Sequence, residues 1–452
     1  MAFSPARLLS SLQEQLAQCG PHSFRLWLAY SGGLDSSVLL HSLCALREQL
    51  PAFSLQAVHI NHGLHDEAGR WADFCAQQCA QRDVPMVSKA VQVSTHKGES
   101  LEAQARQARY EALAACLGEG DILLTAQHAD DQSETLLLQM LRGAGPRGLA
   151  AMPAVSRFAR GWQLRPLLGV SRTALHEWAM SQQLDWLEDP SNREPRFDRN
   201  FLRQQVMPRL KTRWPALNPV LERVTQQQAE AAELLDALAE QDLQAIHSES
   251  GQCLRVSGLL GLTAARQRNV LRYWLRQLHL PLPSRRKLET LCHDVLHAAE
   301  DRVPCVDWPG VEVRRYRDNL YAGPPQPPRP AAADCLAWDL RSPLLLPHGL
   351  GSLHASPGSG EGLSQQVLQA GVQVGFRHGG EHCQPVGQSH HRSLKNLFQE
   401  AAVPPWQRSR TPLVYVGRQL AEIVGLCVCE PFQARPGEQA VQIHWQRNNM
   451  GS

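Results

Sequence analysis

The stretch LAYSGGLDSSVLL, Leu28–Leu40, passes from an apolar segment through two glycines and an aspartate directly into a second apolar segment. This pattern predicts a strand, a tight turn on the glycines and a helix that begins near Leu34. The first N–H groups of a helix have no partner within the helix, and together with the helix dipole they attract anions. Because glycine lets the backbone approach a ligand closely, we predict that the loop Ser31–Ser36 binds phosphate.

Asp35 gives this loop a further chemical feature. The loop lacks the Gly-Lys-Ser/Thr sequence of a Walker A motif and the spacing of a dinucleotide-binding motif. A carboxylate repels a bare phosphate, but a Mg²⁺ ion between the two groups removes the conflict. The plainer alternative is that Asp35 helps to cap the helix. The predicted phosphate-binding residues are Ser31, Gly32, Gly33, Leu34, Asp35 and Ser36, and Asp35 is the predicted metal ligand.

The arrangement of strand-like and helical segments predicts the fold class. From Arg25 to Ala126, short β-like segments alternate with helical ones, which is typical of a parallel sheet with helices on both faces. A long helical segment follows from Asn218, and the proline-rich stretch GPPQPPRPAAA precedes a glycine-rich region. We therefore predict an α/β protein with a Rossmann-like parallel-sheet domain over 1–215, a mostly helical middle domain over 216–322, a linker over 323–333 and a small mixed α+β domain over 334–452.

The overall composition is that of a soluble protein with several domains. The chain has 452 residues and a formal net charge of only +2, so total charge does not by itself indicate nucleic acid. No apolar stretch is long enough to span a membrane, and the N-terminus lacks the pattern of a signal peptide. The twelve cysteines include no Cys-x-x-Cys pair, so we expect free thiols and a cytoplasmic protein.

A second polar segment, TAQHADDQSETLLLQMLRG, follows the fourth predicted strand. Asp131 and Glu134 lie three residues apart and therefore share one face of the predicted helix. One interpretation is a capping box that begins at Asp131 and ends at Glu134. The other is a site where carboxylates bind Mg²⁺ or an ammonium group. The residues alone leave both interpretations open, and His128 lies beside them in the same loop.

Basic residues at helical spacing mark three further places. Arg106 and Arg109 lie three apart, which is also typical of a solvated basic face, while Arg199 and Arg203 lie four apart and suit a phosphate or a carboxylate. Toward the C-terminus, the stretch 375–418 carries Arg and Lys side chains with interspersed aromatic residues. This combination favours RNA binding. The residues expected to contact RNA there are Arg392, Lys395, Arg408 and Arg410.

Several of these segments together resemble a known family. Ser-Gly-Gly-x-Asp-Ser after a first strand resembles the PP-loop of the ATP pyrophosphatase superfamily, whose members bind ATP, adenylate an oxygen and release pyrophosphate. The further segments EAQARQARY, TAQHADDQSETLLLQMLRG, DPSNREPRFDRNFLR and SLKNLFQEAAVPPWQR resemble the tRNA(Ile)-lysidine synthetase family. The resemblance implies ATP-dependent activation of the wobble cytidine in the CAU anticodon of an isoleucine tRNA. Free L-lysine then displaces AMP to form lysidine.

The resemblance also implies roles for particular residues. The loop Ser31–Ser36 would hold pyrophosphate and Mg²⁺, and Arg109 would face the α-phosphate of ATP. Asp131 and Glu134 would bind the ammonium group of lysine, and one of them would then accept its proton. His128 and Arg203 would orient the lysine carboxylate or the base. The expected catalytic residues are Asp35, Arg109, Asp131 and Glu134, Arg199 joins the expected tRNA contacts, and a homodimer is an open expectation.

Two alternatives, one an enzyme of the same fold and one from a different functional class, fit the sequence less well. A tRNA cytidine thiolase of the same fold would need cysteines for sulfur or for an iron–sulfur cluster, and the chain has no Cys-x-x-Cys pair. A non-catalytic RNA-binding protein would need neither the intact loop at Ser31–Ser36 nor the carboxylates of Asp131 and Glu134. Both features therefore favour an enzyme.

Overall fold

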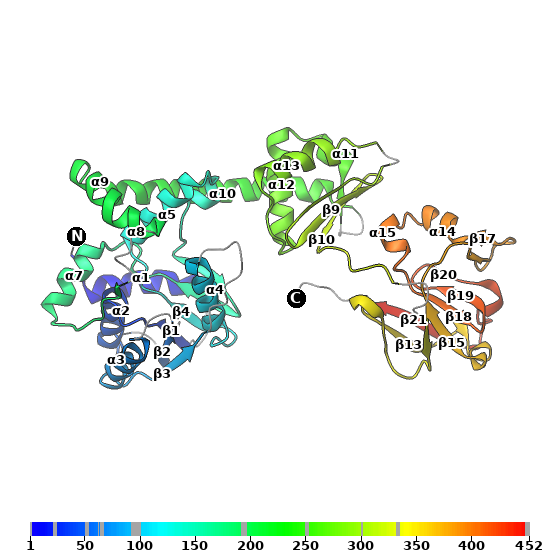
Figure 1. Ribbon diagram of the computed structural model, residues 1–452, viewed down its shortest axis with the longest axis horizontal. Helices are drawn as coiled ribbons and strands as arrows, with labels where there is room; N and C mark the ends of the chain where they lie inside the picture. Colours follow the sequence, from blue (N-terminus) through cyan, green and yellow to red (C-terminus); the bar gives the residue numbers. More distant parts are fainter. Residues whose placement is uncertain are drawn as a thin grey trace. The chain divides into compact units, whose positions relative to one another are not determined.

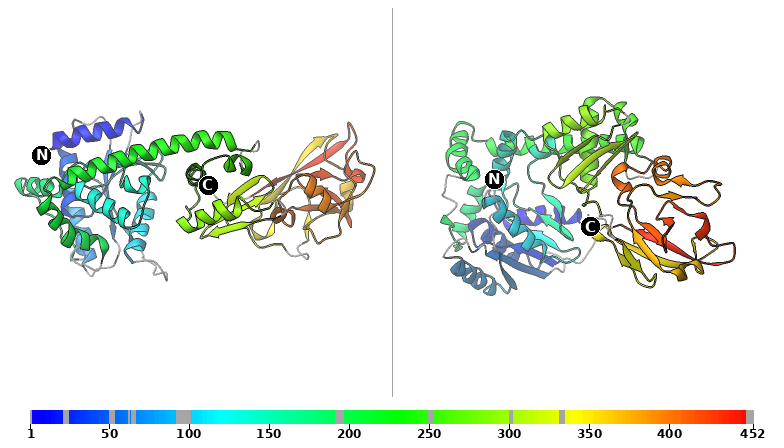
Figure 2. Two further views of the ribbon diagram at one scale, coloured as in Figure 1. Left: turned by 90° about the horizontal axis from the view of Figure 1, so that it is seen from above. Right: turned by 45° about the vertical axis from the view of Figure 1, so that its right-hand side comes forward.

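The computed structural model describes residues 2–20, 25–49, 54–61, 63, 67–91, 101–190, 197–248, 253–299, 302–330 and 335–447. The chain forms two compact units, Met1–Leu234 and Leu235–Ser452, which we describe one at a time (Figure 1; Figure 2 gives two further views). The division between them falls within the long helix α10 (Leu217–Ile246). The domain boundaries expected from the sequence, at 215, 322 and 333, stay predictions.

The first unit is built on a six-stranded sheet in the order β3-β2-β1-β4-β6-β5. Neighbouring strands from β3 to β6 are parallel, and only β5 pairs antiparallel, which confirms the predicted α/β fold. The order reverses between β1 and β4, and in open parallel sheets ligands bind beyond the strand ends at such a point. The strands are β1 (Arg25–Ala29), β2 (Ser54–Asn61), β3 (Met86–Ala90), β4 (Ile122–Leu124), β5 (Val155–Phe158) and β6 (Gly161–Leu164).

Helices cover both faces of this sheet, as Figure 1 shows. In β1, Leu26 and Leu28 belong to a core shared with helices α1, α2, α3 and α7, whereas Trp27 belongs to a separate cluster with Leu113 of α4. A strand that is apolar on both faces is typical of the centre of a parallel sheet. The loop after β1 therefore starts from the most firmly packed strand. The helices are α1 (Pro5–Ala17), α2 (Leu34–Ala45), α3 (Ala68–Ala80), α4 (Leu101–Ala114), α5 (Ala129–Leu141), α6 (Pro146–Leu149) and α7 (Arg172–Ser181).

The segment that follows in the first unit contains an unusual helix. It begins as α8 (Asp198–Phe201), continues as the π-helical turn η2 (Leu202–Val206) and ends as α9 (Met207–Arg213). Single π-helical turns are rare and often lie at functional sites. Here the turn contains Arg203, one of the residues singled out in the sequence.

The second unit begins with an antiparallel sheet in the order β7-β10-β9-β8, packed against helices. Trp274 and Leu271 of α12 and Val313 of β9 are buried in their shared core. The expected helices are present, and the expected short strands form a larger sheet than the sequence indicated. The elements are β7 (Leu254–Arg255), α11 (Val256–Leu260), α12 (Ala264–Gln277), α13 (Arg285–Thr290), η3 (Leu291–Val295), β8 (Cys305–Trp308), β9 (Val311–Tyr316) and β10 (Asn319–Gly323).

The C-terminal part of the second unit is mixed α+β, as predicted. Its sheets have the orders β11-β15-β18-β19-β20, β12-β13-β21-β14 and β16-β17. The strands are β11 (Leu336–Trp338), β12 (Leu344–Leu345), β13 (Ser352–Ser359), β14 (Leu363–Ser364), β15 (Val372–Gly375), β16 (His382–Cys383), β17 (Arg392–Ser393), β18 (Leu413–Val416), β19 (Gln419–Ile423), β20 (Cys427–Val428) and β21 (Gln439–Gln446), with helices α14 (Leu394–Glu400) and α15 (Pro405–Arg408). Across the described residues of both units, no helix has the length and apolar character needed to cross a bilayer.

One disulfide corrects the expectation that all cysteines are free thiols. Cys383 and Cys429 are bonded, with their Cα atoms 5.7 Å apart, and the other ten cysteines are free. The expectation was wrong for this pair because the two residues are 46 positions apart and no local spacing connects them. The antiparallel bridge between Pro385 and Cys429 and the hydrogen bond from the N–H of Glu430 to the carbonyl of Gln384 bring the two segments together.

Candidate active site

The loop after β1 has the geometry of an anion site. β1 ends at Ala29 and α2 begins at Leu34, with Gly33 in an extended conformation as the N-cap, whose own N–H donates to Oγ of Ser31 at 3.4 Å. Asp35 lies in the first turn of α2 and is not the cap, so the capping alternative for this carboxylate has no support. The start of α2 therefore keeps its N–H groups available for a ligand.

Gly32 is required at its position by both conformation and space. Its φ is +78°, and a Cβ atom there would lie 2.9 Å from Sγ of Cys75 and 2.9 Å from Cδ1 of Leu187. The loop is also held by hydrogen bonds, because the N–H of Leu187 donates to the carbonyl of Gly32 at 2.9 Å and the hydroxyls of Ser31 and Ser36 lie 3.1 Å apart. The loop is thus shaped before any ligand binds.

Asp35 and His128 connect this loop to the start of α5. Oδ1 of Asp35 is buried and has no hydrogen-bond partner, which fits a ligand to a cation. The described residues contain no group of three or more His, Cys, Asp or Glu side chains that could hold a metal by themselves, so Mg²⁺ would share Asp35 with phosphate oxygens. Nε2 of His128 lies 3.5 Å from Oδ2 of Asp35 and 3.5 Å from Oδ2 of Asp131.

His128 also caps α5, which corrects the capping box expected from the sequence. The N–H of Asp131 donates to Nδ1 of His128 at 3.3 Å, and the N–H of His128 donates to Oδ2 of Asp131 at 3.1 Å. The box thus begins one turn earlier than Asp131, because His128 is the last extended residue before the helix. Burial disfavours the charged imidazole, but the carboxylates of Asp131 and Asp35 outweigh it and raise the pKa of His128.

Asp131 and Glu134 form a compact charge cluster with Arg199 and Arg203. Nε of Arg203 lies 2.7 Å from Oε1 of Glu134, and its Nη2 lies 2.9 Å from Oδ1 of Asp131. Nε of Arg199 lies 2.8 Å from Oε2 of Glu134, and its Nη2 lies 3.1 Å from the same Oδ1 of Asp131. The negative charges of Asp131 and Glu134 on α5 are therefore balanced by Arg199 of α8 and Arg203 of η2. The sequence had predicted each of these pairs to share one helix face.

The cluster stabilises the charged forms of Asp131 and Arg203. Burial alone would raise the pKa of Asp131, but His128, Arg199 and Arg203 outweigh burial and hold that pKa below its usual range. Burial would lower the pKa of Arg203, but its hydrogen bond and charge interaction with Glu134 raise it. Because Asp131 holds a proton so weakly, it is better suited to bind a cation than to accept a proton at neutral pH.

Arg109 on α4 is a half-buried cation. It forms no ion pair with the described residues, and its closest aromatic neighbour is the ring of Tyr110, 5.6 Å from its guanidinium carbon. Burial lowers the pKa of Arg109, Arg106 and Arg199 lower it further, and Tyr110 opposes them. A half-buried guanidinium with two other cations nearby favours an anionic ligand. The alternative of a solvated basic face, which the sequence left open for both arginines, therefore fits the exposed Arg106 but not Arg109.

Comparison with known proteins decides the family. Residues 7–210 match the PP-loop domain, 254–321 the TilS substrate binding domain, and 372–445 the TilS substrate C-terminal domain. The chain is 43% identical over 444 residues to the tRNA(Ile)-lysidine synthase of Coxiella burnetii (strain RSA 493 / Nine Mile phase I), covering 98% of this chain and 97% of that protein. The chain belongs to the tRNA(Ile)-lysidine synthase family.

A second curated relative agrees with this membership. The tRNA(Ile)-lysidine synthase of Alkalilimnicola ehrlichii (strain ATCC BAA-1101 / DSM 17681 / MLHE-1) is 45% identical over 444 residues, covering 98% of each chain. Among solved structures, the U34-tRNA thiolase NcsA from Methanococcus maripaludis aligns at 14% identity with a TM-score of 0.41, covering 50% of this chain and 79% of that chain. The predicted family is confirmed, and with it an ATP-dependent ligase that modifies tRNA.

In the TilS substrate C-terminal domain, most of the cations expected to contact tRNA are bonded within the protein. Arg392 pairs with Glu400, and Nε of Arg408 donates to the carbonyl of Val403 at 2.8 Å. Nε of Arg410 donates to the carbonyl of Pro327 at 3.0 Å. Lys395 is exposed and forms no ion pair with any described residue. Their roles in tRNA binding stay predictions, as does that of Arg199, which lies in the charge cluster instead of on a free surface.

Asp130 has a role at this site that the sequence did not indicate. It accepts a hydrogen bond from the N–H of Arg172 at 2.8 Å and forms an ion pair with Lys211 of α9. Burial would raise its pKa, but these partners lower it to about 2. Asp130 thus ties α5 to α7 and α9, and only its position in the pair Asp130-Asp131 could have suggested it.

Proposed function

We propose that this chain adenylates the wobble cytidine of an isoleucine tRNA with a CAU anticodon and then attaches lysine to form lysidine. Similarity to tRNA(Ile)-lysidine synthases over nearly the full length supports the reaction. The structural observation that carries the proposal is the position of His128, 3.5 Å from both Asp35 and Asp131. The nucleotide loop and the carboxylates thus adjoin one another, as a two-step reaction on one base requires.

In the first step, the cytosine carbonyl oxygen attacks the α-phosphorus of ATP. A bond forms between that oxygen and phosphorus, the bond to the bridging oxygen breaks, and pyrophosphate leaves. The N–H groups of the loop Ser31–Ser36 bind the leaving pyrophosphate, and Arg109 stabilises the charge that develops on the α-phosphate. Mg²⁺ held by Asp35 would neutralise phosphate charge at this loop.

In the second step, the ε-amine of lysine attacks the activated carbon of the base and AMP leaves. The amine has a solution pKa of about 10.4 and must lose a proton before it attacks, and the carboxylate of Glu134, next to Asp131, accepts that proton. Asp131 and Glu134 attract the ammonium form, while His128 and Arg203 are suited to orient the lysine carboxylate or the base. Because both carboxylates already hold guanidinium groups, lysine binds here by sharing or replacing an arginine, so its arrival loosens Arg199 or Arg203.

The direct test is incubation of the chain with ATP, labelled L-lysine and an isoleucine tRNA transcript that carries the CAU anticodon. We expect label in the tRNA, one AMP and one pyrophosphate per lysine, and no labelling of a transcript whose wobble cytidine is replaced by uridine. Sulfur transfer to the same base without lysine incorporation would instead indicate a thiolase. tRNA binding with no turnover of ATP would indicate a non-catalytic RNA-binding protein.

Further properties of the enzyme follow from its substrates. We expect it to act in the cytoplasm, where tRNA, ATP and free lysine occur together, and to require Mg²⁺. A homodimer stays a prediction.

A further inference from the structure

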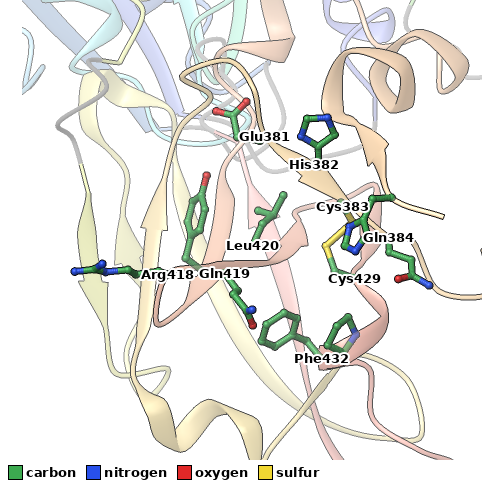
Figure 3. A pocket seen from close by; sticks show the side chains of 12 residues that line it. Glu381, His382, Cys383, Gln384, Arg418, Gln419, Leu420, Cys429 and Phe432 are labelled. Carbon is green, nitrogen blue, oxygen red and sulfur yellow. A yellow bond between two sulfur atoms is a disulfide. The ribbon is translucent and has the colours of Figure 1, made fainter.

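The C-terminal part of the second unit contains a pocket of about 350 Å³ (Figure 3). One wall comes from the β16–β17 hairpin and the other from β18, β19 and the segment after β20. Its volume lies within the range of about 300–1,000 Å³ that is typical of small-molecule sites. The pocket lies in the second unit and includes none of the residues of the candidate active site.

The lining of the pocket combines groups that recognise a nucleotide. Tyr415 and Phe432 supply aromatic rings, Arg418 supplies a cation, and His382 and His391 lie at its edge. Gln419 adds an amide that can both donate and accept hydrogen bonds. Aromatic rings that stack with bases, next to a cation for the phosphate, are the usual means by which proteins bind unpaired nucleotides.

Arg418 is available for a ligand, whereas most arginines nearby are not. It is exposed and forms no ion pair or hydrogen bond with any residue that the structure describes. Arg392, Arg408 and Arg410 are each bonded to other groups of the protein. Free cations contribute to nucleic-acid binding by contacting phosphate, so Arg418 is better placed for this role than the bonded arginines.

The walls of the pocket are held in place before a ligand arrives. The disulfide between Cys383 and Cys429 joins the hairpin wall to the opposite wall, as Figure 3 shows. Glu381 accepts hydrogen bonds from the N–H of Gly379 at 3.0 and 3.1 Å, so its charge is directed into its own loop. A shaped pocket of this kind loses little entropy when it binds a single flexible residue.

We propose that this pocket binds one unpaired nucleotide of the tRNA, with the base against Tyr415 and a phosphate on Arg418. The proposal rests on the proposed function, because it names the part of the tRNA that this region recognises. A base inside a duplex is covered by its neighbours and cannot enter the pocket, whereas an unstacked base at a chain end or in a loop can.

The first experiment compares three pocket variants and one control variant of the full chain in the lysine-incorporation assay. Tyr415→Leu removes the stacking surface and should raise the KM for tRNA roughly five- to hundredfold, with kcat unchanged at saturating tRNA. Tyr415→Phe keeps the ring and should behave like the wild type. Arg418→Ala should raise the KM and reduce the salt slope of tRNA affinity by about 0.7. Arg341→Ala, an exposed arginine outside the pocket lining, is the matched control.

The second experiment uses RNA competitors to identify what the pocket accepts. A short single-stranded oligoribonucleotide should compete with tRNA for the wild type and lose this effect for Tyr415→Leu, while a blunt RNA duplex of equal length should compete equally with both proteins. Preference for the duplex, or unchanged tRNA KM in all pocket variants of an active, folded enzyme, would overturn the proposal. Absence of lysine incorporation by the wild type would overturn the proposed function instead, and the competition experiment would still decide the role of the pocket.

Discussion

The charge cluster of the first unit and the basic stretch 375–418 of the second were predicted from different kinds of sequence information. In the first unit, spacing along two helices placed Asp131 with Glu134 and Arg199 with Arg203, and the structure brings all four together. In the second, the prediction used the number of basic and aromatic residues. The structure shows that Arg392, Arg408 and Arg410 are each bonded to another group of the protein. Spacing indicates which groups meet, whereas composition does not indicate which charges are free.

The largest expected effect tests the nucleotide loop of the first unit. Asp35→Asn keeps the shape of the side chain but ligates Mg²⁺ poorly, so pyrophosphate release with tRNA present should fall at least about 10²-fold. Asp73→Asn, at an exposed position of α3, is the control and should leave the rate unchanged. Near-normal release by a folded Asp35→Asn protein would show that the loop binds its ligand without this carboxylate.

A second prediction concerns a buried charge in the other region. Glu422 of β19 has a buried Oε2 atom without a hydrogen-bond partner, and burial raises its pKa to about 7. Since the folded pKa lies above the unfolded value, the stability it contributes is fully present below about pH 4.5 and is lost as the pH rises through about 7. At pH 8, Glu422→Gln should therefore increase the free energy of unfolding by roughly 2–3 kcal/mol, and at pH 4 it should not.

Urea denaturation at the two pH values is the measurement, and Glu361→Gln at an exposed position is the control. A stability difference that does not depend on pH would mean that Glu422 reaches a partner when it ionises. In that case the C-terminal region would resemble the charge cluster of the first unit, because Glu422, like Arg392, Arg408 and Arg410, would be bonded to another group of the protein.

The third prediction asks whether the charge cluster serves the lysine substrate. Glu134→Gln removes one charge-assisted bond, which is worth about 1.5–3 kcal/mol, so the KM for lysine should rise roughly ten- to a hundredfold while that for ATP changes little. Glu177→Gln, on the exposed side of α7, is the control. If the variant loses thermal stability while the KM values for lysine and ATP stay unchanged, the cluster only holds helices together. The spacing of these residues in the sequence would then have predicted a structural contact and not a lysine site.

The smallest expected effect separates free from bonded cations. Lys395→Ala should remove one phosphate contact and reduce the salt slope of tRNA affinity by about 0.7–0.9, with stability unchanged. Arg410→Ala should leave the slope unchanged and lower the melting temperature, because the carbonyls of Pro327 and Trp406 lose their donor. Equal salt slopes for the two variants would mean that bonded and free cations contact tRNA alike. The content of basic residues alone would then be enough to predict the tRNA contacts.

Sequence reasoning succeeded where a local pattern determines the outcome. The strand before Ser31 and the helix after it follow from apolar periodicity, and the need for Gly32 follows from its conformation. Sequence reasoning failed where the structure depends on contacts between segments that are distant in the sequence. Strands β6 and β5 are short, β6 depends on pairing with β4 and the edge strand β5 on pairing with β6, and the disulfide joins residues 46 positions apart. The cap of α5 was misplaced because histidine is a less common capping residue than aspartate.

The π-helical turn η2 limits how this protein can change in evolution. A π-helical turn contains an extra residue compared with an α-helical turn, so deleting one residue between Leu202 and Val206 would let the segment become α-helical. Because the extra residue is accommodated within the turn, the helix beyond it would stay nearly in place, and only side chains of the turn itself would change direction. Lys211 would then stay at Asp130 and Arg199 at Glu134, whereas Arg203, which lies within the turn, would lose its position beside Asp131 and Glu134. Functional relatives should therefore keep the length of this turn constant, even though a deletion here would leave the flanking helices in place.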